Sequence, residues 1–427
     1  MKKWFVLLLT ILMIVSCVGT SAESNNDISA TLDVALAADM APDSVTEWVR
    51  MFNDEYPNIK LNVTLVDASN YTATFEPLVA ADAMPDVMAV APHDYYRNLA
   101  EKGYLLDCGE MDGWDRQVDF VQDAFTSESG LRFGVSNGVS TMVLFYNEDH
   151  FAQAGITELP TCWEEFIECC EKLKTAGFAP MAVAGAGSNN LAHSFMGFGI
   201  AYEVYGSGYD KNWVANNMTG EYDYDVDAWK RVLDRLVYLR DKGYFQKGYE
   251  SADLYEVLRI LASGEASMSI QQTSQAGNIF LDDGVNLNCM AVPWNYRGQP
   301  NVAISWACDG VGLGRNANNE KNLEAAKIFF EFVTYENAWV YQNMVGGLSP
   351  FKTMEDMPKA IVDNRVQSAW ESNAQMEQSG LPAQSFSAPV YAQVRNFVQE
   401  VTLGLAEPDM IGEYLNAAQM EYATTLK

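Results

Sequence analysis

The chain has 427 residues, of which 48% are hydrophobic and 12% aromatic, a composition typical of a well-packed globular protein. Its 57 acidic residues outnumber its 27 basic ones and give a formal net charge of −30, which argues against nucleic acid as a partner, because phosphates are bound by Lys and Arg. The acidic excess indicates no ligand by itself, since a spread of acidic residues is typical of a soluble surface.

The N-terminal segment has the features of an export signal. Basic residues precede an apolar run of about a dozen residues, shorter than the roughly 20 needed to cross a bilayer. The run ends in IVSC (14–17), which resembles the lipobox of bacterial lipoproteins, a family in which the peptide is cut before an acylated cysteine. We therefore expect residues 1–16 to be a lipoprotein signal peptide, Cys17 to be lipidated and residues 17–27 to form a tether. Cleavage after Ala22, behind small residues, is the alternative.

The segment that follows predicts alternating strands and helices. Residues 32–39 (LDVALAAD) and 59–66 (IKLNVTLV) alternate apolar with other side chains, as strands with one buried face do. Between them, apolar side chains at helical spacing predict a helix over 42–56, which Pro57 stops. A second helix, over 71–79, leads to a short apolar strand, VMAVA. The order β-α-β-α-β predicts parallel strands joined by crossovers.

The middle of the chain is more helical. A helix over 161–177 begins with Thr161 and Glu164, which have the spacing of a capping box, and ends at a glycine. Continuous helices are also predicted over 227–243 and 254–264, and the second is followed by a strand, ASMSI. About 400 residues remain after the leader, which is too many for one hydrophobic core, so we predict an α/β protein with two lobes.

Cysteines and histidines show no arrangement that predicts a metal site. The six cysteines after the leader form neither a C-x-x-C pair nor the spacing of a disulfide-rich domain. Cys170 lies on the apolar face of the helix over 161–177 and is expected to be a small buried hydrophobe. The three histidines, His93, His150 and His193, lie far apart in the sequence and form no H-E-x-x-H motif. We expect no metal and no cofactor.

No catalytic motif stands out. The stretch GVSNG (134–138) matches the G-x-S-x-G pattern, but a nucleophile elbow needs a helix directly after the serine, and the following VSTMVLFYN predicts a strand. The chain has neither a complete dinucleotide fingerprint nor a G-K-[ST] phosphate loop. A carboxylate pair of the glycosidase kind stays open, because 57 acidic residues offer many pairs. We expect a protein that is not an enzyme.

Six segments in the right order resemble the family 1 extracellular solute-binding proteins, the receptor components of sugar-importing ABC transporters. They are FNDEYPNIKLNV, MPDVMAV, FGVSNGVSTMVLFYNEDHFAQAGI, LPTCWEEFIECCEKLKTAG, SGEASMSIQQTSQAGNI and GLGRNANNEKNLEAAKIFFEFVT. Each segment alone is a weak signal, but together they run along nearly the whole chain after the leader. The lipobox agrees with this resemblance, because such receptors are commonly tethered through a lipid.

The resemblance implies a type II periplasmic-binding-protein-like fold, in which hinge segments join two α/β lobes and the ligand lies in the cleft between them. Lobe one would comprise residues 28–138 plus 275–358, and lobe two residues 139–274 plus 359–427. The third quoted segment would be one of the two or three passages at which the chain crosses between the lobes.

The resemblance also implies a monomeric receptor, lipid-anchored to the cell membrane on its extracellular face. It would close its hinge around a carbohydrate, with an oligosaccharide as the expected ligand, and deliver it to the permease subunits of an ABC importer. Two alternatives stay open: a receptor for an amino acid, polyamine or organic acid, and a secreted carbohydrate-active enzyme. The sequence does not predict which sugar or solute binds.

Candidate ligand contacts follow from two rules. Ligand sites in open α/β sheets lie beyond the carboxyl ends of strands, and sugars need planar polar groups and aromatic faces. Applied at the positions that the resemblance indicates, these rules select Asp39, His93, Asp94, Tyr95, Asn137, Ser140, Ser188, Asn189, Asn190, Gln272, Thr273, Trp306, Asp309 and Tyr391. An ordinary loop or cap role is the alternative for the polar residues, and core packing is the alternative for Trp306.

One position departs from the family pattern. Many sugar receptors of this family carry a tryptophan directly after the return strand, where this chain has QTSQ (272–275). Either Trp306 or a tyrosine, Tyr95 or Tyr391, replaces that stacking platform, or the ligand is smaller or less sugar-like.

Overall fold

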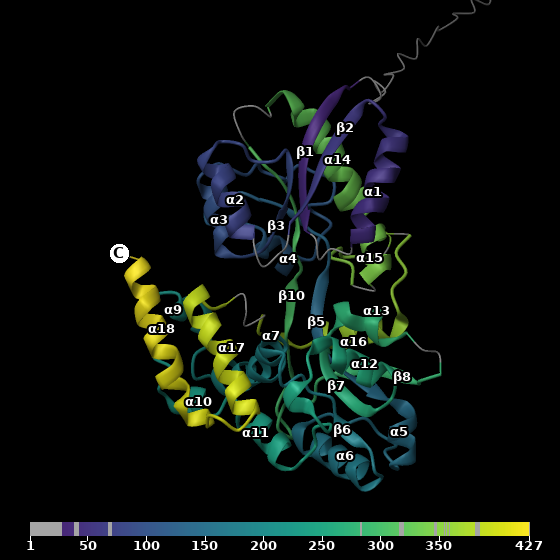
Figure 1. The fold of residues 1–427 in the computed structure, drawn as a ribbon, viewed down its shortest axis with the longest axis vertical. Helices are drawn as coiled ribbons and strands as arrows, with labels where there is room; N and C mark the ends of the chain where they lie inside the picture. Colours follow the sequence, from purple (N-terminus) through teal and green to yellow (C-terminus); the bar gives the residue numbers. More distant parts are fainter. Residues whose placement is uncertain are drawn as a thin grey trace, which may run out of the picture.

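The computed structural model describes residues 28–37, 42–66, 71–281, 284–315, 320–345, 348–353, 355, 357, 359–380 and 385–426. Two lobes lie one above the other, and strands run between them (Figure 1). The mixed α/β class predicted from the sequence is confirmed. The predicted signal peptide, Cys17, the tether and Asp39 lie outside the described residues. Among the described helices, none combines the length and the apolar character that a membrane span requires.

The first lobe is built on a five-stranded sheet with the strand order β2-β1-β3-β11-β4. β1 pairs in parallel with β2 and β3, whereas β11 is antiparallel to β3 and β4. The parallel pairing predicted for the N-terminal strands is therefore confirmed. The strands are β1 (Ala30–Ala37), β2 (Ile59–Val66), β3 (Val87–Val90), β4 (Val135–Ser136) and β11 (Gly310–Leu313).

Helices pack beside this sheet, with α2 and α3 on its left in Figure 1 and α1 on its right. In α1, Trp48 and Phe52 share the apolar face and are fully buried, and the indole Nε1 of Trp48 donates to the carbonyl of Asn337 at 2.8 Å. The helix ends at Glu55, just ahead of Pro57, as predicted. The helices are α1 (Pro42–Glu55), α2 (Tyr71–Ala80), α3 (Asp94–Glu101), α4 (Asp119–Ala124), α14 (Leu323–Glu331) and α15 (Trp339–Val345).

The second lobe has a sheet in the order β10-β5-β7-β6, with β8 paired to β5 as well. Helices of the middle and the end of the chain surround it, and Cys170 is fully buried there, as predicted. The strands are β5 (Val139–Asn147), β6 (Ala179–Met181), β7 (Ala266–Gln272), β8 (Leu287–Ala291) and β10 (Ser305–Ala307), with a small pair of β9 (Val302–Ala303) and β12 (Glu377–Gln378). The helices are α5 (Glu148–Gln153), α6 (Trp163–Thr175), α7 (Ser188–Leu191), α8 (Gly197–Ile200), α9 (Trp213–Asn217), α10 (Asp227–Lys230), α11 (Asp234–Asp241), α12 (Leu254–Ala262), α13 (Ala276–Ile279), α16 (Asn364–Ala374), α17 (Ala388–Thr402) and α18 (Ile411–Thr425).

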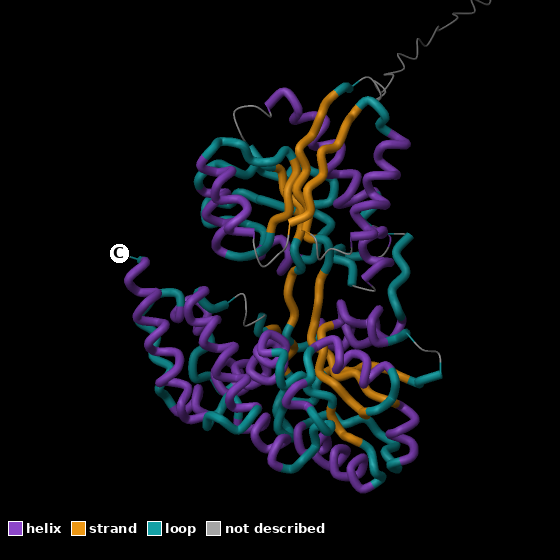
Figure 2. Tube along the Cα trace, in the orientation of Figure 1, coloured by secondary structure: helices purple, strands orange, loops and turns teal. Residues whose placement is uncertain are grey.

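The expected boundary at residue 275 needs a correction. β8 pairs with β5 along residues 143–147, and β10 pairs with the same edge of β5 along residues 139–141. The chain therefore stays with the second sheet after β7 and returns to the first lobe only between β10 and β11. The two strands seen between the lobes in Figure 2 are β5 and β10. The sequence could not show that β8 and β10 belong to the second sheet, because their pairing depends on which edge of β5 has no other strand beside it.

Two local expectations for the middle helices also differ from the structure. The N-cap of α6 is Cys162 and not Thr161, and the carboxylate that bonds Thr161 belongs to Glu165, which accepts from its N–H at 2.9 Å and its hydroxyl at 2.8 Å. The helix predicted over 227–243 is broken into α10 and α11. The break includes Val232, whose carbonyl lies so close to α8 that a Cβ on Gly199 would stand 1.8 Å from it.

The crossing strands are joined by buried hydroxyl groups. Thr141 in β5 donates to the carbonyl of Ile304 at 3.0 Å, and its oxygen accepts from Ser305 at 3.0 Å and from the carboxamide of Asn373 in α16 at 2.7 Å. One hydrogen and two lone pairs are the full capacity of a hydroxyl group, so Thr141 is saturated. The same residue thus links β5, β10 and α16.

The G-x-S-x-G stretch belongs to this crossing. Ser136 is 1% exposed, and its hydroxyl lies 2.7 Å from the carbonyl of Gly138 and 2.9 Å from that of Cys308. Strand β5 follows it, as predicted, and not a helix. The hydroxyl therefore has a structural role between two crossing segments.

Candidate ligand-binding site

A pocket of about 150 Å³ opens on the second lobe, where β7 ends and α7 begins. In Figure 1, α7 lies at the end of the second lobe that is nearest the first lobe. Three predicted contacts, Asn189, Asn190 and Gln272, line this pocket. The remaining lining residues are Met142, Gly187, His193, Leu254 and Gln271. None of the lining side chains carries a carboxylate, an ammonium or a guanidinium group.

Asn190 is held from inside the protein. Its Nδ2 donates to Oε1 of Gln271 at 2.9 Å, and Nε2 of Gln271 donates to the hydroxyl of Ser269 at 3.0 Å. Gln271 and Ser269 are each 1% exposed, whereas Asn190 is only partly buried. The carboxamide of Asn190 is therefore fixed on its inner side and accessible on its outer side.

Tyr391 joins the pocket from α17, more than 190 residues later in the chain. Its hydroxyl lies 2.7 Å from Oδ1 of Asn189 and 2.9 Å from Nε2 of His193. Burial lowers the pKa of His193 to about 4, and the charge of Arg395 lowers it further in the same direction. The imidazole is therefore neutral at pH 7, and the pocket is uncharged.

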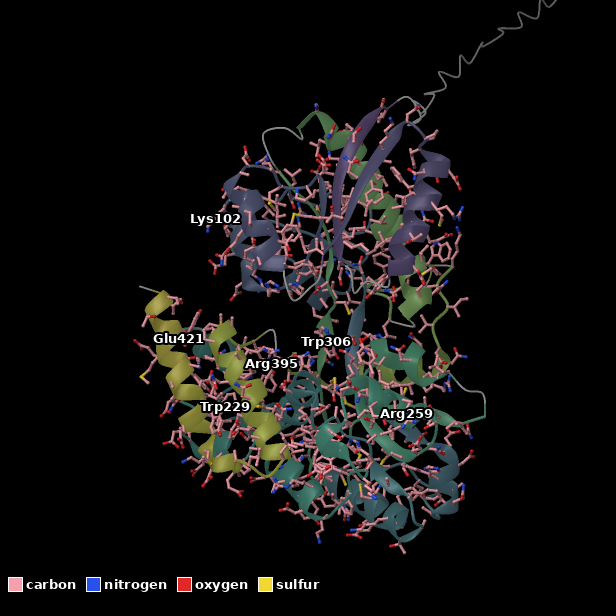
Figure 3. All side chains as sticks on the ribbon, in the orientation of Figure 1. Lys102, Trp229, Arg259, Trp306, Arg395 and Glu421 are labelled. Atoms are coloured by element: carbon pink, nitrogen blue, oxygen red, sulfur yellow. The ribbon has the colours of Figure 1, made fainter. Side chains whose placement is uncertain are left out.

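A second group of predicted residues meets at the crossing strands. Trp306 in β10 lies opposite Ser140 in β5, and the hydroxyl of Ser140 is 3.3 Å from that of Thr273, just after β7. Trp306 is 8% exposed and belongs to the buried apolar cluster of the second lobe. Figure 3 places it at the level where the two lobes meet. Most of its indole ring is therefore buried in the apolar core of the second lobe, and only a small part is exposed.

A third group lies in the first lobe. The rings of His93 and Tyr95 both approach Tyr96, with centroids 5.1 and 5.2 Å away, and Tyr71 donates its hydroxyl to Asp309 at 3.2 Å. The ring centroids of Tyr71 and Tyr96 are 5.9 Å apart, so these residues are contiguous. Burial lowers the pKa of His93 to about 4, since the effects of Asp94 and Arg97 oppose each other.

Three further predicted contacts, Asp94, Ser188 and Asn137, lie beside these groups. Asp94 is exposed at the start of α3 and forms an ion pair with Arg97 at 3.2 Å. Ser188 is the first residue of α7 and is partly exposed. Asn137 is 5% exposed, and its N–H donates to the carbonyl of Asp309 at 3.0 Å, so its main chain belongs to the crossing.

Sequence reasoning missed Gln271 and His193. His193 was considered only as a metal ligand, because nothing in the sequence brings it near Tyr391. Gln271 directly precedes the predicted contact Gln272, so the return strand did indicate its neighbourhood. Trp48 in α1 and Trp229 in α10 are fully buried, so they pack in the cores of the two lobes.

Two α/β lobes joined by crossing strands, with a pocket of uncharged side chains on one lobe, define the class of two-lobed binding proteins. The chain belongs to the bacterial extracellular solute-binding protein family, whose profile matches residues 24–338. The family resemblance noted in the sequence is thereby confirmed.

Among proteins of known function, the chain is similar to the multiple sugar-binding protein of Streptococcus mutans, with 21% identity over 353 residues and 77% of each chain covered. It is also similar to the sn-glycerol-3-phosphate-binding periplasmic protein of Brucella melitensis, with 21% identity over 324 residues, 72% of this chain and 71% of the relative. A solved chitin oligosaccharide binding protein matches 93% of this chain and 99% of its own with a TM-score of 0.76. At 20% identity, that likeness shows the fold alone.

Proposed function

We propose that this protein is the receptor of an ABC importer and binds a neutral carbohydrate by closure of its two lobes. The observation that carries the proposal is the uncharged pocket, which is lined by carboxamides and a neutral imidazole. Such groups form hydrogen bonds with sugar hydroxyls but supply no counter-charge for a phosphate or a carboxylate. The family, and relatives that include a multiple sugar-binding protein, support the same class of ligand.

Binding would involve both lobes. Asn189, Asn190 and Gln272 form one surface, and the aromatic group around His93 and Tyr95 forms a second surface on the other lobe. A ligand that contacts both surfaces only when they approach each other favours the closed state, because closure then adds contacts. The hydroxyl-linked crossing at Thr141 is our candidate hinge.

The remaining parts of the proposal concern location and partners. The IVSC sequence at 14–17 supports lipidation at Cys17, which would hold a monomeric receptor at the extracellular face of the membrane beside its permease. The protein would need no cofactor and would release its ligand chemically unchanged, as a transport receptor does.

A thermal-shift screen of the secreted chain tests the function. The panel contains neutral mono- and oligosaccharides, amino acids, polyamines and sn-glycerol 3-phosphate. A ligand present at 100 times its Kd adds about 2.7 kcal/mol to the free energy of unfolding, which raises the melting temperature measurably. A shift with one saccharide class and no product formed supports the proposal. A shift with sn-glycerol 3-phosphate or an amino acid, and none with saccharides, contradicts it.

A further inference from the structure

A directional chain of hydrogen bonds ends at Asn190 in the pocket. It begins at the main-chain carbonyl of Ala182, which accepts from the hydroxyl of Ser269 at 2.9 Å. Ser269 accepts from Nε2 of Gln271 at 3.0 Å, and Gln271 accepts through Oε1 from Nδ2 of Asn190 at 2.9 Å. Every residue between the two ends is almost fully buried.

The chemistry of the groups fixes the direction of this chain. A carbonyl oxygen can only accept, so the single hydroxyl hydrogen of Ser269 points to Ala182. Gln271 must then use its amide hydrogens toward Ser269, which places its own oxygen toward Asn190. Asn190 must in turn donate with its nitrogen. Its oxygen, Oδ1, is left on the accessible side, where it has no hydrogen-bond partner among the described residues.

Reversal of the Asn190 carboxamide is therefore unfavourable. It would bring Oδ1 against Oε1 of Gln271, two acceptors with no hydrogen between them. Rotation of Gln271 as well would only move the conflict inward, because its oxygen would then face a hydroxyl whose hydrogen is already used. A buried polar group left without a partner destabilises a fold substantially, so the chain keeps one polarity.

The neighbouring chain through Tyr391 has no such anchor. It runs from Asn189 through the tyrosine hydroxyl to Nε2 of His193, and neither end is a main-chain carbonyl. If the Asn189 carboxamide turns over, Tyr391 can donate to the imidazole, which then takes the other neutral tautomer. Asn189 can thus present either a donor or an acceptor, whereas Asn190 presents only an acceptor.

We propose that Gln271 is a positioning residue that fixes Asn190 as an obligatory hydrogen-bond acceptor, so that the pocket selects ligands that donate a hydroxyl hydrogen. The inference rests on the proposed function and deepens it. A hydroxyl group of a neutral polyol satisfies Oδ1 of Asn190, whereas an ionised phosphate or carboxylate group placed there offers it only lone pairs. The side chains that line the pocket include no cation to offset this repulsion; Arg395, whose guanidinium carbon lies 5.5 Å from the ring centroid of Tyr391, is not among them.

The first test measures polarity directly in the unliganded receptor. Selective ¹⁵N labelling of asparagine side chains allows NMR detection of their NH₂ groups, and the Asn190→Asp variant assigns the Asn190 signal by its loss. We expect the Asn190 amide hydrogen that bonds to Gln271 to exchange with solvent at least about tenfold more slowly than the amide hydrogens of exposed asparagines. Exchange as fast as that of the side-chain amide of the exposed Asn98 overturns the proposal.

The second test uses Gln271→Met, which removes the carboxamide at similar side-chain length. The matched control is Gln419→Met: Gln419 is also buried in this lobe, but its carboxamide donates to the main-chain carbonyl of Asn217 at 2.7 Å, and neither residue lines the pocket. We titrate maltotriose, raffinose and sn-glycerol 3-phosphate calorimetrically. We expect Gln271→Met to accelerate hydrogen exchange at the Asn190 amide and to raise the Kd for trisaccharides about tenfold or more. The affinity ratio by which the receptor prefers a trisaccharide to sn-glycerol 3-phosphate should become smaller in this variant. Gln419→Met should change neither property.

The two proposals fail in different ways. If no saccharide binds but the Asn190 amide is protected in the native protein and exposed in Gln271→Met, the proposed function is wrong and the positioning role stands. If trisaccharides bind equally to the native receptor and to Gln271→Met, the positioning role is wrong and the proposed function stands. The first test does not use Gln271→Met, so a failure of that variant to fold leaves the first test decisive.

Discussion

Gly310 lies at the point where the returning chain enters the first sheet, and its replacement by alanine gives a prediction that the structure makes quantitative. A Cβ on Gly310 would stand 2.2 Å from the carbonyl oxygen of Val135 on the neighbouring strand β4, and 2.9 Å from the Cα of Ser136. Ordinary contact begins at 3.4 Å, so β4 and β11 would have to part by about 1.2 Å. Both obstacles are main-chain atoms, which have no rotamer with which to move aside.

The expected cost has two parts. Overpacking of a well-packed region costs about 1–3 kcal/mol, and the loss of a β11–β4 hydrogen bond adds about 1 kcal/mol. We therefore expect Gly310→Ala to lower the free energy of unfolding by roughly 2–4 kcal/mol. For a lobe of this size, that corresponds to a fall in Tm of about 4–16 °C.

Differential scanning calorimetry of the unliganded receptor measures the effect. Gly113→Ala is the matched control, because a Cβ there would meet its nearest neighbour, the Cβ of Tyr335, at an ordinary 3.5 Å. The control should lie within about 0.5 kcal/mol of the native protein. If Gly310→Ala also lies within that margin, the close approach of β4 and β11 at the crossing does not constrain the fold, and the reasoning is refuted.

Three further predictions concern other parts of the molecule. Burial lowers the pKa of His193 to about 4, below the 6.5 of an unfolded histidine, so the unfolded state binds more protons between these values. The free energy of unfolding should fall as the pH drops from 6.5 to 4, by at most about 3 kcal/mol from His193. In His193→Gln, the urea-denaturation midpoint should depend less on pH in that window. An unchanged pH dependence contradicts the lowered pKa of His193. The guanidinium carbon of Arg235 lies 4.1 Å from the ring centroid of Tyr296 and 5.0 Å from that of Trp163. Arg235→Lys loses the planar stacking on these rings and should lower the free energy of unfolding by about 1–3 kcal/mol. An unchanged Tm would show that these cation–π contacts do not stabilise the fold. Replacement of Cys17 by serine should release the receptor from membranes or leave its leader uncut, and unchanged retention on cell fractionation rules out lipidation there.

The fold of the first lobe was readable from local patterns. Its parallel strands and helices have clear periodicities, and Pro57 marks the end of a helix where the structure ends it. β8 was placed in the wrong lobe, since pairing with β5 depends on which strand edge is free, and that is decided by distant segments. The break between α10 and α11 was missed for a similar reason, because it lies where Gly199 of another helix packs against the carbonyl of Val232.

The candidate site shows the same division. Asn189, Asn190 and Gln272 could be selected because each follows a predicted strand, and the structure brings all three to one pocket. The predicted contact Tyr391 does touch Asn189, but its partnership with His193 joins segments that are 198 residues apart. Whether these residues touch the ligand stays a prediction that the binding experiments address.

The sequence by itself determined the class of fold, the family and the polar residue types near the site, because periodicity and strand-end chemistry are local properties. Only the tertiary structure decided the lobe boundary, the buried tie at Thr141 and the direction of hydrogen bonding at Asn190. That direction depends on Ala182, Ser269 and Gln271 at once. The side chains of Ser269 and Gln271 could donate or accept differently in another setting, and only their order in space, ending at a carbonyl that can only accept, leaves a single arrangement.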